Sequence, residues 1–150
     1  MCPEGQCGCP QLVLRLVLGS VFFAHGAQKV LGWFGGYGLG PTLQMFTQYM
    51  HIPAPFAWLA IAAEFLGGLG LIFGVFTRLA AFGIAVDMIV AVAMVHWKNG
   101  FFMNWGGKQA GEGFEYHLLA IAICIALMMM GAGRASIDGC LKKCGKPKTA

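Results

Sequence analysis

The sequence predicts an all-α fold, an integral membrane bundle of four transmembrane helices with aromatic, glycine-rich outer loops. The chain of 150 residues is 58% hydrophobic and only 11% charged, whereas about a quarter of the residues in a soluble domain are charged. Its apolar residues form long blocks rather than one helical stripe, and roughly 20 apolar residues span the hydrocarbon core of a bilayer. These two observations favour a membrane protein over the alternative, a soluble helical bundle.

Four apolar blocks reach that length, and we predict spans at about residues 12–34, 55–76, 79–97 and 114–133. The length supports a single domain, which covers residues 1–150 and has cysteine-containing tails at 1–11 and 134–150. The start of the chain carries too little positive charge, and the first block too many polar residues, for a cleaved signal peptide.

The connections between the spans differ in length. Thr77 and Arg78 leave room only for a tight turn, so the second and third spans are predicted to be antiparallel neighbours. The segments 34–54 and 98–113 are rich in glycine and aromatic residues, and tryptophan prefers the membrane–water interface. We expect both segments to cover the outer end of the bundle, with a short helix around residues 42–50.

Basic residues predict the orientation of the bundle. With four spans, both tails and the turn between the second and third spans share one side. That side carries most of the basic residues outside the spans, namely Arg78, Arg134, Lys142, Lys143, Lys146 and Lys148. The positive-inside rule then places both termini in the cytoplasm, with the protein in the cell inner (plasma) membrane. The basic tail faces anionic lipid, so we predict the lipid bilayer as a partner and no nucleic acid.

Several ionisable residues lie inside the predicted spans. A charge near the middle of a bilayer costs about 2.5–3.5 kcal/mol on insertion scales, so such residues face one another or a wet cavity. His25 and Lys29 are four residues apart and are expected on one face of the first span. Glu64 of the second span is expected to pair with one of them. We predict a catalytic set of His25, Lys29 and Glu64.

A wider polar site is predicted to bind a cofactor through Arg15, His25, Lys29, Glu64, Asp87 and His117. The alternative is that ion pairs only hold the helices together, while Arg15 and Lys29 extend to the nearest interface. For Arg15 the structural role is favoured. Asp87 and His96 are nine residues apart, which is about 180° around a helix, so His96 is predicted to be a bystander at the interface.

The tails carry five cysteines that an even number of spans places on one side of the membrane. They are Cys2, Cys7, Cys9, Cys140 and Cys144. Clustered thiolates bind zinc, copper or iron–sulfur clusters, and we predict these residues as metal ligands, with redox-active thiols and incidental cysteines as the alternatives. Their spacing matches no ferredoxin motif. Cys124 lies within the fourth span and is predicted to be a small packing residue.

Three stretches of the sequence carry a family resemblance. They are RLVLGSVFFAHGAQKVLGWFGGYG, AEFLGGLGLIFGVFTRLAA and GEGFEYHLLAIAICIALMMMGAGRASID. Together they resemble the DoxX family of small four-helix membrane proteins. The motif positions of the family are occupied by Arg15, His25, Gly26, Lys29, Glu64, Gly67, Gly68, Arg78, Gly133, Arg134 and Asp138.

The resemblance implies membrane redox chemistry, because members are similar to the DoxD-type subunit of thiosulfate:quinone oxidoreductase. On this basis we expect a membrane subunit of a redox system. Its expected reaction is the quinone-linked oxidation of a sulfur or thiol compound, or redox detoxification. His25 would bind a quinone carbonyl, Lys29 would stabilise developing negative charge, and Glu64 would transfer protons. An oxyanion such as thiosulfate would favour Lys29 equally.

Two other classes of function stay open at this point. One is a non-catalytic membrane anchor or assembly partner for a soluble oxidoreductase. The other is a metal-handling or small-solute transport protein, which the tail cysteines would serve. The expected protein partner is a component of a membrane redox complex or a second copy of the chain.

Overall fold

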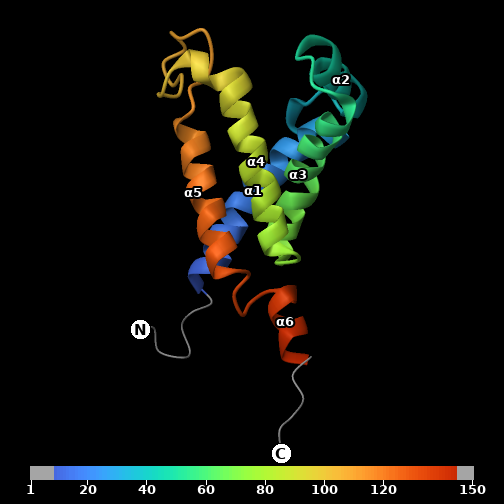
Figure 1. Cartoon of the computed structure of the whole chain (residues 1–150), viewed down its shortest axis with the longest axis vertical. Coiled ribbons are helices and arrows are strands. Elements are labelled where there is room, and N and C mark those ends of the chain that lie inside the picture. The colour runs from blue at the N-terminus through green and yellow to red at the C-terminus, as the bar shows by residue number, and fades with distance from the viewer. Residues whose placement is uncertain (1–8, 145–150) are drawn as a thin grey trace, which may run out of the picture.

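The computed structural model describes residues 9–144, and the side chains of residues 9–141. Every regular element within those residues is helical, which confirms the predicted all-α class (Figure 1). The long helices are α1 (Cys9–Leu31), α3 (Ala54–Phe73), α4 (Thr77–Ala91) and α5 (Glu115–Met130). A π-helical turn, η3 (Val92–His96), and a 3-10 turn, η4 (Trp97–Asn99), continue α4.

Length and composition qualify three of these helices to cross a membrane, namely Cys9–Leu31, Ala54–Phe73 and Thr77–Asn99. The fourth, α5, is apolar but has 16 residues. At 1.5 Å per residue it is about 24 Å long, somewhat shorter than the roughly 30 Å hydrocarbon core. The four predicted spans therefore correspond to three clear candidates and one shorter apolar helix.

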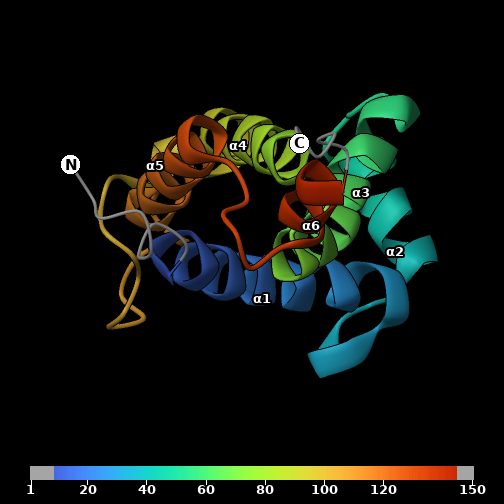
Figure 2. The ribbon, with the colours of Figure 1, turned by 90° about the horizontal axis from the view of Figure 1, so that it is seen from below.

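The helices run alternately up and down, and both ends of the described chain lie at the same end of the bundle (Figure 1). Helix α1 packs mainly against α3, α3 against α4, and α4 against α5. The contact between α1 and α5 is much smaller. Seen from below, α1 lies on one side of the bundle and α4 with α5 on the other (Figure 2). The predicted antiparallel neighbours, α3 and α4, are joined by the short turn before Thr77.

The glycine-rich segment after α1 folds into three short helical elements at the upper end of the bundle (Figure 1). They are η1 (Trp33–Gly35), α2 (Leu39–Gln44) and the π-helical turn η2 (Met45–Tyr49). The short helix predicted around residues 42–50 is thus present and begins three residues earlier. The second outer segment, between η4 and α5, caps the upper end of α4 and α5.

Close packing of α1 on α3 depends on small residues. A Cβ atom added at Gly26 would lie 2.5 Å from the Cα atom of Phe65, and one at Gly68 would lie 2.5 Å from the backbone nitrogen of Phe23. Any side chain there would force the two helices apart. Cys124 is fully buried in the apolar core, where it acts as the predicted packing residue. The short helix α6 (Ile137–Cys144) lies at the lower end.

Candidate functional site

An ion pair between α1 and α3 lies at the centre of the candidate site. The Nζ atom of Lys29 donates to Oε2 of Glu64. The Glu64 side chain is only 7% exposed, whereas that of Lys29 is 26% exposed. Lys29 follows Gly26 by three residues, so the close approach of the helices at Gly26 brings the ammonium group within reach of Glu64. Of the two partners that the sequence offered for Glu64, the structure therefore shows Lys29.

Asp87 adds a second carboxyl group from α4. Its side chain lies near that of Glu64 and close enough to Lys29 for their charges to interact. The three helices α1, α3 and α4 thus contribute one cation and two carboxyl groups to the same part of the bundle.

Tyr116 of α5 completes this group, and sequence reasoning missed it. Its hydroxyl oxygen is buried without a hydrogen-bond partner among the described residues, and its side chain lies within electrostatic range of Glu64. A buried hydroxyl group without a partner costs free energy, so a hydroxyl held in this state is free to bind a ligand. The signal available in the sequence was a phenol in the first turn of the fourth span.

A pocket opens from the outer loops onto Lys29. It has a volume of about 220 Å³ and is lined by Gln28, Lys29, Gly35, Gly36, Tyr37, Thr42 and Met45. Lys29 lies over the ring of Phe46, with its Nζ atom 5.8 Å from the ring centre. Two hydrogen bonds hold the pocket walls, from Gln28 Nε2 to the Phe34 carbonyl at 3.2 Å and from Thr42 Oγ1 to the Gly38 carbonyl at 2.7 Å. A small polar ligand could therefore reach Lys29 from the outer side.

His25 does not belong to this group. Its side chain is exposed on the surface of α1, so the prediction that it faces the same pocket as Lys29 is wrong in geometry. Four residues of an α-helix turn through about 400°, which leaves the two side chains about 40° apart. The long side chain of Lys29 can bend back toward Glu64 across this angle, whereas the shorter His25 cannot.

His117 lies in a second polar group, at the outer end of α4 and α5. Its side chain is 6% exposed, and its Nδ1 atom has no hydrogen-bond partner among the described residues. The rings of His96 and His117 contact each other with their centres 4.1 Å apart and their planes tilted by 42°, and His96 Nδ1 lies 2.8 Å from the Glu112 carbonyl oxygen. Tyr116 and His117 rings are in edge contact at 5.6 Å.

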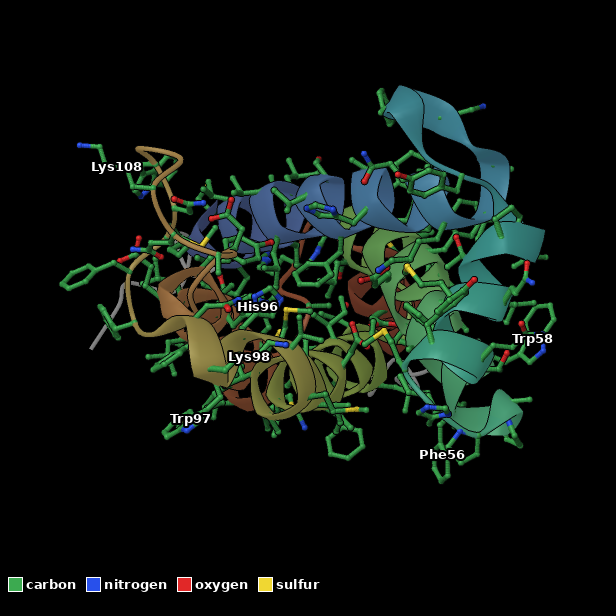
Figure 3. The ribbon with its side chains drawn as sticks, turned by 90° about the horizontal axis from the view of Figure 1, so that it is seen from above. Phe56, Trp58, His96, Trp97, Lys98 and Lys108 are labelled. Atoms are coloured by element: carbon green, nitrogen blue, oxygen red, sulfur yellow. The ribbon has the colours of Figure 1, made fainter. Side chains whose placement is uncertain are left out.

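His96 thus lies outside the group around Asp87, as predicted, but it packs on the His117 ring and is not isolated at the interface. In Figure 3 His96 is turned toward the interior, while Trp97 projects away from the bundle. The prediction assumed a uniform α-helix from Asp87 to His96. The residues before and including His96 form a π-helical turn, which is wider than an α-helical turn and changes the direction of the side chains that follow.

At the opposite end of the bundle, Arg15 of α1 donates hydrogen bonds to backbone carbonyl groups of two other segments. Its guanidinium group donates to the carbonyl oxygens of Leu71, Ile72, Ala132 and Ala135. Nε lies 2.9 Å from the Leu71 oxygen, at the last turn of α3. The Arg15 side chain is buried, and four of its five N–H donors are occupied. These donors hold the end of α3 to the connection between α5 and α6, which supports the structural role favoured from the sequence, and a role in cofactor binding stays a prediction.

The cysteines of the tails are only partly described. Cys2 and Cys7 and the side chain of Cys144 lie outside the described residues, while Cys9 and Cys140 are exposed free thiols. Within the described part of the chain, no three His, Cys, Asp or Glu side chains come close enough to hold a metal ion. The metal site predicted at the five tail cysteines stays a prediction.

The fold and these residues define a class, a small multi-pass membrane protein with a buried ion pair and a carboxyl pair where four helices meet. The chain belongs to the DoxX family, whose sequence model matches residues 11–97. The match covers α1, α3 and α4, and so includes Lys29, Glu64 and Asp87. The family resemblance of the sequence is confirmed.

Three relatives are similar over most of their length. The chain is 33% identical over 116 residues to "Putative oxidoreductase CatD" of Bacillus subtilis, covering 77% of this chain and 76% of the relative. It is 29% identical over 138 residues to an uncharacterized protein of Haemophilus influenzae, covering 91% and 85%. It is 27% identical over 132 residues to "Inner membrane protein YqjF" of Escherichia coli, covering 88% and 92%. No solved structure matches.

Proposed function

We propose that this protein is the membrane subunit of a redox system and that Lys29, Glu64, Asp87 and Tyr116 form its quinone site. The observation that carries the proposal is the group of one cation and two carboxyl groups between membrane helices, with Glu64 buried and Lys29 and Asp87 partly buried. Ionisable residues within a membrane are expensive and mark sites of ligand binding or proton transfer. The relative named as an oxidoreductase, CatD, supports the redox class.

The residues of the site fit a quinone. A bound quinone supplies two-electron, two-proton chemistry, so it needs hydrogen-bond donors at its oxygens and a source of protons. Lys29 and Tyr116 are the donors, since the ammonium is reachable from the outer pocket and the phenol has no other partner among the described residues. Asp87 and Glu64 lie within the same group and act as the acid or base.

Electrons reach or leave the site through a protein partner, which is either a component of a membrane redox complex or a second copy of the chain. The substrate that we propose for that complex is a sulfur or thiol compound, with redox detoxification as the alternative. A protein that serves only as an anchor for a soluble oxidoreductase would need none of the four site residues for ligand binding, and this difference allows a test.

The test is to purify the chain anaerobically in a mild detergent, extract it for quinone, and titrate it with a water-soluble short-tailed quinone. We expect stoichiometric binding that falls at least about tenfold in Lys29→Met and in Glu64→Gln, which corresponds to about 1.4 kcal/mol. Lys98→Met is the matched control, because Lys98 lies neither in the ion pair nor in the pocket lining and should leave binding unchanged. Absence of quinone, with all variants equal, would support the anchor.

We also propose that the protein lies in the inner membrane with both termini in the cytoplasm. The name of its relative YqjF supports the membrane, and the excess of basic residues at the lower end of the bundle supports the orientation. The exposed Cys9 and Cys140 provide a direct assay. A thiol reagent that cannot cross membranes should label the chain only after the cells are permeabilised, whereas a Lys108→Cys variant should be labelled in intact cells. Labelling of the unaltered chain in intact cells would reverse the orientation.

A further inference from the structure

The two histidines beneath the outer segment between η4 and α5 lead from the outer end of the bundle into its interior. Their rings are in contact, with centres 4.1 Å apart. His96 is partly exposed, whereas His117 is only 6% exposed. His96 is also the titratable group whose charge acts on His117 from the neighbouring helix. Neither histidine belongs to the proposed quinone site.

The hydrogen bond of His96 determines the nitrogen at which its ring takes up a proton. The Glu112 carbonyl oxygen, 2.8 Å from Nδ1, can only accept, so Nδ1 carries the hydrogen. In the neutral ring Nε2 is then the acceptor. The two carboxylates of this end are engaged by the outer segment, since Glu112 Oε2 lies 2.7 Å from the Asn104 backbone nitrogen and Glu115 Oε1 lies 3.3 Å from Trp105 Nε1. His96 is therefore the group of this cluster that is placed to exchange a proton with water.

Tyr116 connects the histidine pair to the buried carboxyl groups. Its ring is in edge contact with that of His117, with centres 5.6 Å apart. Its side chain also lies within electrostatic range of Glu64 on α3 and of Cys124. Cys124 is eight residues further along α5, or about 12 Å along the helix axis. The phenol therefore lies between the level of the histidines and that of Glu64.

Each buried residue of this series has a polar atom without a hydrogen-bond partner among the described residues. These atoms are Nδ1 of His117 and the hydroxyl oxygen of Tyr116. A buried polar atom without a partner costs free energy, and a phenylalanine would fill either position without that cost. Packing alone therefore does not explain an imidazole followed by a phenol at these two positions.

We propose that His117 passes protons between the outer end of the bundle and Tyr116, with His96 as the group that exchanges them with water. The inference rests on the proposed function and deepens it, because it identifies the residues through which protons reach the quinone. A ligand bound in the outer pocket closes the direct way from water to Lys29, so that its protons need a second way. The histidines provide that way from the side of α4 and α5.

The proton and electron balance is that of quinone reduction. The two quinone oxygens take up two protons, and the redox partner supplies two electrons. Tyr116 gives its proton to a quinone oxygen and receives another from His117, which is protonated in turn by His96 and water. Oxidation of the quinol runs through the same groups in reverse. His117 therefore acts through Tyr116 and does not touch the quinone.

The test follows the reduction of a short-tailed quinone bound to the full chain in lipid nanodiscs. Dithionite supplies the electrons in place of the partner, and stopped-flow absorbance gives the rate. We expect His117→Asn to bind the quinone as the unaltered chain does and to slow its reduction at least about tenfold, because general acid–base catalysis contributes about 10²–10⁴ in rate. The matched control is His51→Asn, which removes an exposed imidazole outside this series and should leave the rate unchanged.

Two further measurements separate proton transfer from a structural role. The rate of the control should fall as the pH rises through the range in which an imidazole loses its proton, roughly pH 5–8, and this fall should be absent in His117→Asn. Imidazole added to His117→Ala should restore the rate, whereas it should not restore the rate of Tyr116→Phe.

Equal rates and equal pH profiles for His117→Asn and the control would overturn the inference and leave the proposed function standing. A slower rate that keeps its pH dependence and is not restored by imidazole would also overturn it, since packing would explain that result. If the His117 variants do not fold, His96→Gln replaces them, because its amide can still donate to the Glu112 carbonyl; an unchanged pH profile there would overturn the inference. Absence of quinone binding to the unaltered chain would overturn both proposals.

Discussion

Removing both partners of the Lys29–Glu64 pair should cost less than the sum of the two single losses. Lys29→Met leaves a carboxyl group that is 7% exposed, and Glu64→Gln leaves an ammonium that is 26% exposed. Breaking a buried pair in this way costs about 3–5 kcal/mol. Two features reduce the cost here, because Lys29 is partly exposed and Asp87 can replace Glu64 as a partner. We therefore expect each single variant to lose about 1–3 kcal/mol of unfolding free energy.

The double variant carries neither charge, so its loss should be smaller than the sum of the two single losses by about 1–2 kcal/mol. The assay is reversible unfolding of the detergent-solubilised protein by sodium dodecyl sulfate, followed by circular dichroism and analysed as a double-mutant cycle. The matched cycle pairs Lys98→Met with Glu64→Gln. Lys98 lies eleven residues beyond Asp87, or about 16 Å along a helix, so this cycle should be additive within about 0.5 kcal/mol.

A coupling free energy below about 0.5 kcal/mol for the Lys29–Glu64 cycle would refute the reasoning. It would mean that the ammonium extends into solvent and that the buried carboxyl group is held by Asp87 alone. The cycle is independent of ligand binding, so its result also separates the stability of the pair from the function proposed for it.

Three further predictions concern the framework that holds the site. Arg15→Leu removes four hydrogen bonds to backbone carbonyls and should cost at least about 3 kcal/mol, because such bonds to a charged group contribute about 1.5–3 kcal/mol each. Unchanged unfolding in detergent would contradict the role given to Arg15. Gly26→Ala should cost about 1–3 kcal/mol by overpacking and should weaken quinone binding by separating Lys29 from Glu64, whereas Gly40→Ala, which meets no atom within 4 Å, should be neutral in both assays. Asp138→Asn should cost about 1 kcal/mol, since the carboxylate accepts hydrogen bonds from the backbone nitrogens of Phe76 and Thr77, each at 3.0 Å; faster hydrogen exchange at the start of α4 is the expected readout, and unchanged exchange would argue against this cap.

The sequence by itself determined the class of fold. A block of about 20 apolar residues has the length of a membrane-spanning helix, and a helix forms all of its backbone hydrogen bonds within the segment. The tight turn before Thr77 requires α3 and α4 to be antiparallel neighbours. The same logic predicted that Glu64 pairs with Lys29 or His25, because isolated charges within a span are too expensive to leave alone; the structure shows that the partner is Lys29. Cys124 was likewise predicted as a packing residue from its apolar surroundings.

The tertiary structure decided which of the remaining polar residues share a site. Periodicity gives the direction of a side chain along a regular helix, but it gives neither the local change caused by a π-helical turn at His96 nor the length over which a side chain can bend. For this reason His25 and Lys29, though four residues apart, have different surroundings. Arg15 could be assigned to the backbone only once the end of α3 and the connection between α5 and α6 were seen to meet around it. Tyr116 entered the site because α5 lies opposite α3, a relation between helices that no spacing within either of them contains.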